Sequence, residues 1–218
     1  MKNFAQKLAV CVSLTTLLAS TAYATTVRVD RGNVLVVDDN GFARQLTTTG
    51  LDASPALSPD KRSVVFVRRT PQKAVATGAG DATADQLWVV KLDGTSPRLL
   101  AEGHESNDPK TTLAALGTPA FSPDGRTVYF RSAAWATSGA IHAVAVTGGK
   151  DRFVTAGSSV AVVPSGEYAG YLIVNKHKYW LAGGSYDWFW LVAPNGEEKG
   201  AVGPDESSIP TFIDMYAK

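Results

Sequence analysis

Aromatic and basic side chains are concentrated in one stretch, residues 171–190, which reads YLIVNKHKYWLAGGSYDWFW. A Gly183-Gly184 turn interrupts it, so the rings on both sides of the turn are expected to reach solvent. Exposed Trp and Tyr rings carry binding energy at protein interfaces, and such rings also stack on sugars. The predicted binding residues are Lys176, His177, Lys178, Tyr179, Trp180, Tyr186, Asp187 and Trp188. The alternative is that these rings pack inside strands, with alternate residues buried.

No catalytic motif accompanies this stretch. His104, His142 and His177 form neither an H-x-x-x-H nor an H-x-H pair, so their spacing does not predict a metal site. The chain lacks the G-x-S-x-G motif of a hydrolase serine. Residues 78–80, Gly-Ala-Gly, miss the last glycine of a dinucleotide-binding loop. We therefore expect a protein that is not an enzyme, with no cofactor and no metal.

The first 24 residues have the features of a secretory signal peptide. Lys2 and Lys7 precede an apolar run that is too short to span a bilayer, and Ala22-Tyr23-Ala24 is a cleavage signal. The predicted organisation is a signal peptide at 1–24 and a single domain at 25–218, with no membrane span.

The composition of the exported part narrows the function further. The single cysteine, Cys11, lies in the signal peptide, so disulfides, thiolate catalysis and Cys-ligated zinc are excluded. Removing Lys2 and Lys7 changes the formal net charge from +1 to −1, and no basic run is present. Electrostatic binding to nucleic acid or to an anionic membrane is therefore not expected. A cysteine-free exported chain suits a bacterial periplasm.

The framework that carries the aromatic stretch is indicated by two hairpins with nearly the same sequence. PALSPDKRSVVF occupies residues 55–66, and PAFSPDGRTVYF occupies 119–130. A degenerate third copy begins at Val160. Proline presets the turn, and the aspartates, Asp60 and Asp124, are expected to accept bonds from turn amides. β-Branched and aromatic residues on both sides favour strands, and we expect Phe66 and Phe130 to be buried between sheets.

A second unit recurs between these hairpins. It is an apolar strand that ends in a turn glycine, and a short strand follows it. The four glycines are Gly41, Gly94, Gly148 and Gly196, with a spacing of roughly 50 residues. Together the units predict four short antiparallel strands per repeat and no long helix, which is typical of a propeller blade.

The alternation of apolar strand, D-G, R-x-L-T and P-A-x-S-P-D-G-R-x-V-x-F resembles the TolB-like β-propeller repeat, a relative of the WD-repeat blade. The resemblance covers most of residues 34–202. It implies an all-β fold, a small propeller of about four blades with four antiparallel strands each. It also leaves open an ion in the axial channel of the propeller, which some propellers contain.

The ends of the chain determine how such a ring would close. Residues 26–47 supply three strands without an inner one, and residues 211–216 read as a spare strand. We expect the C-terminal strand to pair with the first blade and close the ring, since closure removes exposed edges. An open half-propeller that forms a homodimer and a decayed six-bladed relative are the alternatives. Residues 71–85, rich in small residues, are expected to form a mobile loop.

The predicted function is an exported, non-catalytic binding or scaffold protein of the cell envelope. It would dock an envelope protein or polysaccharide on the propeller, as a monomer or homodimer. Two alternatives remain open from the sequence. One is a propeller-type hydrolase or lyase, and the other is a carbohydrate-binding module that uses the aromatic hairpin at 176–190.

Overall fold

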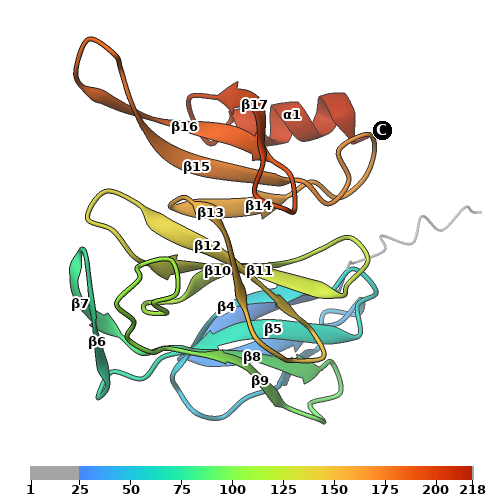
Figure 1. Ribbon diagram of the computed structural model, residues 1–218. Helices are drawn as coiled ribbons and strands as arrows, with labels where there is room; N and C mark the ends of the chain where they lie inside the picture. The colour runs from blue at the N-terminus through green and yellow to red at the C-terminus, as the bar shows by residue number, and fades with distance from the viewer. Residues whose placement is uncertain (1–24, 218) are drawn as a thin grey trace, which may run out of the picture.

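The computed structural model describes residues 25–217, and the predicted signal peptide at 1–24 lies outside the described residues. The strands form a series of antiparallel sheets along the chain (Figure 1). The first sheet contains β1 (Thr26–Asp30), β2 (Asn33–Val37) and β3 (Ala43–Gln45). The second contains β4 (Asp52–Leu57), β5 (Ser63–Arg68), β8 (Gln86–Lys91) and β9 (Arg98–Glu102). No helix in this described part is long and apolar enough to cross a membrane.

The third and fourth sheets repeat the four-stranded pattern. The third contains β10 (Gly117–Phe121), β11 (Thr127–Ala133), β12 (Gly139–Ala145) and β13 (Arg152–Ala156). The fourth contains β14 (Ser159–Val162), β15 (Leu172–Tyr179), β16 (Ser185–Val192) and β17 (Glu198–Gly203). In each sheet the strands pair antiparallel in chain order, and the connection from β5 to β8 also contains a separate small hairpin at residues 74–83.

The repeated hairpins form as predicted. The Ser58 hydroxyl donates to Asp60 at 2.6 Å, and the Arg62 amide donates to the same carboxylate at 3.1 Å. Asp124 accepts the equivalent bonds from Ser122 and Arg126. These hydrogen bonds, that of the serine first, hold the pKa of each aspartate below its ordinary value. The expectation that both aspartates brace their turns is confirmed.

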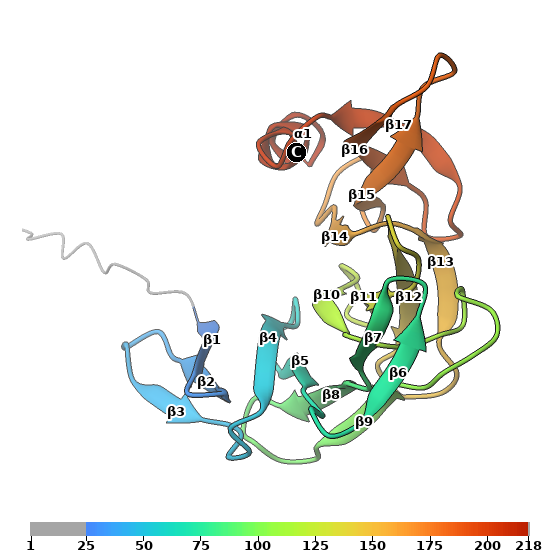
Figure 2. The ribbon, with the colours of Figure 1, turned by 90° about the vertical axis from the view of Figure 1, so that its left-hand side faces the viewer.

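The sheets pack face to face in an open arc (Figure 2). Val34 of the first sheet packs against Val64 and Phe66 of the second. Phe130 of the third sheet lies in one cluster with Leu87 of the second, and this interface is the largest apolar core of the described residues. Phe66 and Phe130 are 1% and 0% exposed, as predicted.

Arginines on the outer strands tie each sheet to the next. Each guanidinium donates to a backbone carbonyl that lies two residues before the turn glycine of the following sheet. The pairs are Arg44 with Leu92, Arg98 with Val146 at 3.1 Å, and Arg152 with Pro194 at 2.9 Å. These bonds explain the arginine in the repeat. Gly200 occupies the same place in β17, and the described chain places no further sheet beyond β17.

The predicted closing strand is wrong, because residues 208–216 form a helix, α1 (Ser208–Tyr216). Its apolar residues, Ile209, Phe212, Ile213 and Tyr216, have the i, i+3, i+4, i+7 spacing of an amphipathic helix. Pro210 lies in the first turn, where proline is tolerated. Within residues 25–217, no C-terminal strand is added to the first sheet, so the first and fourth sheets are not linked in the way that we expected.

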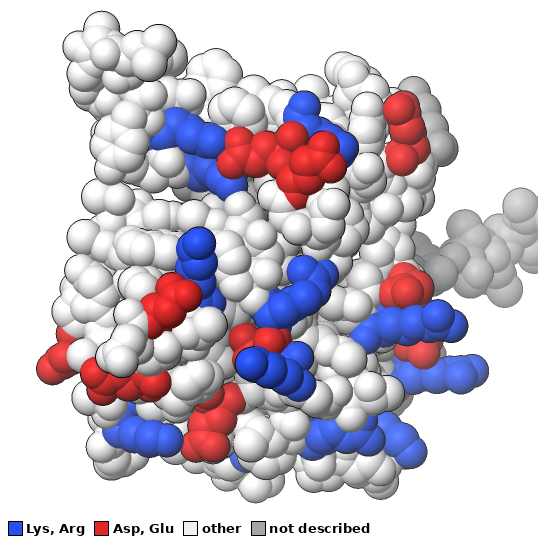
Figure 3. Space-filling model, viewed as in Figure 1, with Lys and Arg blue, Asp and Glu red and all other residues white. Residues whose placement is uncertain are grey.

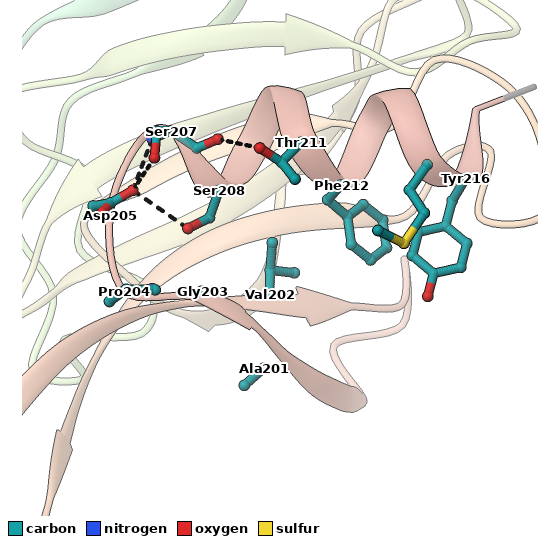
Figure 4. A pocket seen from close by; sticks show the side chains of 11 residues that line it. Ala201, Val202, Gly203, Pro204, Asp205, Ser207, Ser208, Thr211, Phe212 and Tyr216 are labelled. Atoms are coloured by element: carbon teal, nitrogen blue, oxygen red, sulfur yellow. Dashed lines mark hydrogen bonds between the residues drawn. The ribbon is translucent and has the colours of Figure 1, made fainter.

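Helix α1 covers the face of the fourth sheet that points away from the third sheet (Figure 1). Phe212 and Ile213 pack with Ile173, Phe189 and Leu191. Asp205 accepts bonds from the Ser207 amide and from the hydroxyls of Ser207 and Ser208, and thereby fixes the start of the helix (Figure 4). A cleft of about 360 Å³ remains between α1 and β17.

The degenerate third hairpin copy provides the seat for the end of α1. The Ser165 hydroxyl, which replaces the usual turn aspartate, donates to the carbonyl oxygen of Ala217 at 2.6 Å. A Cβ on Gly166 would lie 1.9 Å from the carbonyl oxygen of Tyr216, so only glycine permits this close approach. The loss of the repeat pattern at this turn is therefore linked to the helix.

The prediction of a loop at 71–85 is also wrong. This segment forms a hairpin of β6 (Ala74–Thr77) and β7 (Gly80–Thr83). Val75 is buried beside Ala114 and Ala133, and the Gly78 amide donates to the carbonyl oxygen of Ala134 at 2.8 Å. A small apolar cluster and two backbone bonds, to Ala134 and from Ala115 beside the third sheet, thus hold a segment whose composition alone favours a loop.

Candidate binding surface

The hairpin of β15 and β16 extends beyond the sheet to which it belongs. The inner strand β14 pairs only with residues up to Asn175, and the outer strand β17 pairs with residues from Phe189 onward. The four residue pairs from Lys176–Trp188 to Tyr179–Ser185 have no strand on either side. We call residues 176–188 the aromatic ribbon, which projects from the molecule at the upper left of Figure 1.

One face of the aromatic ribbon is lined by stacked rings. Trp180 stacks on Tyr186 with a centroid distance of 4.1 Å, and Trp188 meets Tyr186 edge-on at 5.8 Å. Strand alternation places Lys176 and Lys178 on the same face. This face continues toward the third sheet, because Leu172 and Trp190, further along it, pack in the core between the third and fourth sheets.

The two lysines of this face are held by a carboxylate from another strand. Glu198 on β17 accepts a bond from Lys176 on one oxygen and from Lys178 on the other, each at 2.7 Å. Lys176 also donates to the hydroxyl of Thr155 on the third sheet and is buried. The Lys178 ammonium lies 4.6 Å from the centre of the Trp190 ring. The structure therefore places Lys176 inside the protein, where it fixes the base of the ribbon.

The opposite face of the ribbon carries a polar pair. Nδ1 of His177 lies 2.9 Å from a carboxylate oxygen of Asp187, its cross-strand neighbour. The Tyr179 ring meets the imidazole edge-on at 5.0 Å. All eight predicted binding residues thus lie together on the ribbon, but they are divided between its two faces.

The tip of the ribbon is exposed and uncharged. Tyr179, Trp180 and Leu181 are 69%, 55% and 110% exposed. The turn forms through a bond from the Gly183 amide to the Trp180 carbonyl, and both Gly183 and Gly184 have positive φ. No charged residue occurs between Tyr179 and Tyr186, and the projecting end is correspondingly white in Figure 3. Charges of both signs are interspersed over the rest of the face shown there.

Sequence reasoning missed two residues of this surface. Leu181 was not predicted, although its position next to the Gly-Gly turn is a signal for exposure. Glu198 could not have been found, because its pairing with Lys176 and Lys178 depends on the register of β17 against β16. The rings predicted to be exposed differ among themselves, since Tyr186 and Trp188 are half-buried while Tyr179 and Trp180 are open.

Replacing Glu198 with glutamine is expected to lower the free energy of unfolding by about 1–2 kcal/mol at pH 7, because two lysines lose their carboxylate. Burial raises the pKa of Glu198, but the bonds from Lys176 and Lys178 outweigh it and hold the pKa below its ordinary value of 4.5. A lowered pKa stabilises the folded protein above pH 4.5, and this contribution is lost as the pH falls through the folded-state value. The difference between wild type and variant should therefore shrink below pH 4.5 in urea-unfolding curves.

The matched control is Glu197→Gln. Among residues 25–217, Glu197 forms an ion pair only with Lys199, at 2.7 Å, and it is more exposed than Glu198. A surface pair of this kind contributes little. Equal losses in the two variants would show that Glu198 does not hold the ribbon.

The histidines outside the ribbon have structural surroundings. His142 is fully buried, with Nδ1 2.8 Å from Asp151 and its ring stacked on Phe130. Burial raises the pKa of Asp151, but the bond to His142 outweighs it, so the pKa is lowered. His104 lies outside the core, with Nδ1 3.0 Å from the carbonyl oxygen of Glu102. Across residues 25–217, no three His, Cys, Asp or Glu side chains are grouped as a metal site.

No protein-family model matches the chain, and no curated protein sequence is significantly similar to it. The fold is nevertheless similar to solved propellers. TolB from Acinetobacter baumannii matches with a TM-score of 0.55 and 17% identity, over 83% of this chain and 40% of that one. A putative TolB from Agrobacterium tumefaciens matches with 0.52 and 17%, over 79% and 58%.

A third similar structure is the β-propeller domain of the Trilobed protease from Pyrococcus furiosus, described as having an open velcro topology. It matches with a TM-score of 0.51 and 12% identity, over 81% of this chain and 52% of that one. Identities this low show the fold alone, so the chain has a TolB-like β-propeller fold. The chain spans roughly half the length of these structures.

Proposed function

We propose that this protein is a non-catalytic docking protein of the bacterial cell envelope, exported to the periplasm, which binds a partner protein through the aromatic ribbon. The observation that carries the proposal is the projecting, uncharged tip with Tyr179, Trp180 and Leu181 exposed. Large exposed apolar side chains are costly in water unless a partner covers them. Trp and Tyr are also the residues that most often dominate binding energy at interfaces.

The arrangement of the tip favours a protein over a polysaccharide. A sugar stacks on an open aromatic face, and Trp180 and Tyr186 cover one face of each other, so each ring of this stack offers at most one face. Leu181, at the apex, has no flat face to offer a sugar and instead fits an apolar pocket. The salt bridges of Glu198 with Lys176 and Lys178 hold the ribbon in one geometry. A rigid ribbon loses less entropy when it binds.

The double substitution Trp180→Ala with Leu181→Ala is expected to abolish capture of the partner. The truncated side chains are exposed, so the melting temperature should stay within about two degrees of wild type. The measurement is crosslinking in the native periplasm, identification of the partner by mass spectrometry, and titration of the two purified proteins. A loss of about 2 kcal/mol or more, about 30-fold in Kd, is expected for residues that anchor an interface.

The control is Phe42→Ala, because Phe42 is 75% exposed and lies in the turn before β3, away from the ribbon. This variant should bind as wild type does. Equal binding by the double variant would refute the role of the ribbon. Loss of peptidoglycan binding in the double variant, with no protein partner affected, would favour the carbohydrate-binding alternative.

A further inference from the structure

The first sheet lacks the inner strand that each of the other three sheets has. In those sheets the first strand in the order, nearest the centre of the arc, is β4, β10 or β14, and it pairs with β5, β11 or β15 respectively (Figure 2). The first sheet has the order β1-β2-β3, and β2 ends in an Asp-Asn-Gly turn, as the third strand of the repeat does. Strand β1 is therefore a second strand, and the described residues supply no strand along its inner edge.

Side-chain exposure at β1 agrees with a missing strand along its inner edge. Val67 of β5 has the same place in its sheet as Val29 in β1, since each pairs with the residue seven positions before the turn glycine, and Val67 is 2% exposed. Val29, by contrast, is 39% exposed, although it lies on the face of β1 from which Val27 packs against the second sheet. Thr26, Arg28 and Asp30 lie on the other face and are exposed as well. The same place in the repeat is thus covered in one sheet and uncovered in the other. Figure 2 shows β1 at the open end of the arc, next to β4.

The backbone of β1 has free hydrogen-bonding groups along this inner edge. Val34, which pairs with Val29, accepts from the Leu46 amide and donates to the Thr47 hydroxyl, both on the β3 side. Val29 and Val34 are therefore a pair without mutual hydrogen bonds, and alternation makes Val27 equivalent to Val29. The amides and carbonyls of Val27 and Val29 point away from β2. Nothing among residues 25–217 bonds them there.

We infer that the inner edge of β1 docks an extended segment of a partner protein, which adds to the first sheet as an antiparallel fourth strand. Strand addition to an open sheet edge gains its affinity from main-chain bonds and its specificity from alternate side chains. The site lies on the first sheet and is independent of the aromatic ribbon in the fourth sheet.

The side chains of β1 indicate the chemistry of that segment. Directly opposite residues on paired strands interact, and opposite charges stabilise the pair. Arg28 and Asp30 are exposed, and neither belongs to an ion pair of the described residues. An antiparallel partner meets Asp30 first, then Val29, Arg28 and Val27. The expected order is therefore a basic residue, an apolar residue, an acidic residue and a second apolar residue.

The first experiment supplies such a strand in the same chain. The segment KVEVTSPDGR is fused directly before Thr25, so that its turn copies Ser122–Arg126, Thr25 takes the place of Thr127, and the KVEV strand lies opposite Val27 to Asp30. Hydrogen exchange of the Val27 and Val29 amides is expected to slow at least tenfold. The control fusion KPEPTSPDGR has the same length and charge, but its prolines, opposite Val27 and Val29, cannot donate to β1. Unchanged exchange in the KVEV fusion would overturn the inference that β1 accepts a strand.

The second experiment tests docking between molecules. A fluorescent SKVEVS peptide should bind the unfused protein. It should not bind the KVEV fusion, because the fused strand already occupies the inner edge of β1. Val29→Pro, which removes one edge donor, should weaken binding at least tenfold relative to Val29→Ala, which keeps the donor and also truncates the side chain. Equal binding to the fusion, or no saturable binding up to about 1 mM, would overturn docking at this edge.

Discussion

Replacing Phe130 with alanine is expected to lower the free energy of unfolding by about 3–5 kcal/mol, the cost typical of deleting a large aromatic side chain from a core. Phe130 is fully buried and belongs to the cluster that joins the second and third sheets. Its ring also stacks on His142 at 5.5 Å. The substitution therefore leaves a cavity at the central interface of the arc. Urea unfolding followed by Trp fluorescence measures the loss.

Two controls make this result specific. Phe42→Ala deletes the same ring from an exposed position and should change stability by less than about 0.5 kcal/mol. Phe66→Ala, at the equivalent place in the second sheet, should match the loss in Phe130→Ala. A marginal effect at both buried sites would mean that the sheets do not pack through these faces.

Ending the chain after Gly203 is expected to cost on the order of 5 kcal/mol, because it removes α1 and uncovers the apolar side chains beneath it. Ile173, Phe189 and Leu191 are 0–5% exposed and lie under the helix. Their exposure should also increase the binding of apolar dyes and favour aggregation. Thermal unfolding and dye fluorescence measure both effects.

If the truncated chain does not fold, a point substitution tests the contact between α1 and the fourth sheet instead. Gly166→Ala places a methyl group against the carbonyl oxygen of Tyr216 and adds strain at a φ of +78°, so it should displace the end of α1. The control is Met215→Ser, since Met215 is 60% exposed. If neither the truncation nor Gly166→Ala lowers the melting temperature more than Met215→Ser does, α1 does not protect the fourth sheet.

The strands were predictable because their signals are local. Ser-Pro-Asp-Gly turns with β-branched residues on either side determine a hairpin without reference to the rest of the chain. Helix α1 was not predictable, because the pattern of a short apolar segment is compatible with both a strand and a helix. Packing against a particular surface decides between them. That surface is the uncovered face of the fourth sheet. The sequence did contain a trace of this contact, in the Ser165-Gly166 turn that departs from the repeat.

The candidate site was predictable to a similar extent. The Gly-Gly turn and the density of aromatic residues predicted an exposed tip, and Tyr179 and Trp180 lie there. The burial of Lys176 was not predictable, because it depends on Thr155 of the third sheet and Glu198 of β17. The hairpin at 74–83 escaped prediction for the same reason. Its single buried apolar side chain, Val75, gives no periodic pattern.

The open arc also determines how the molecule loses structure. In a stack where each sheet contacts only its neighbours, stability is close to a sum of nearest-neighbour terms, and unfolding begins at the ends. The fourth sheet is covered by α1, whereas the first has three strands and an uncovered side. Amides of β1 to β3 should therefore exchange through low-energy fraying, in a cooperative unit separate from the rest. The fourth sheet, with the aromatic ribbon, is insulated from that fraying by the two sheets between them.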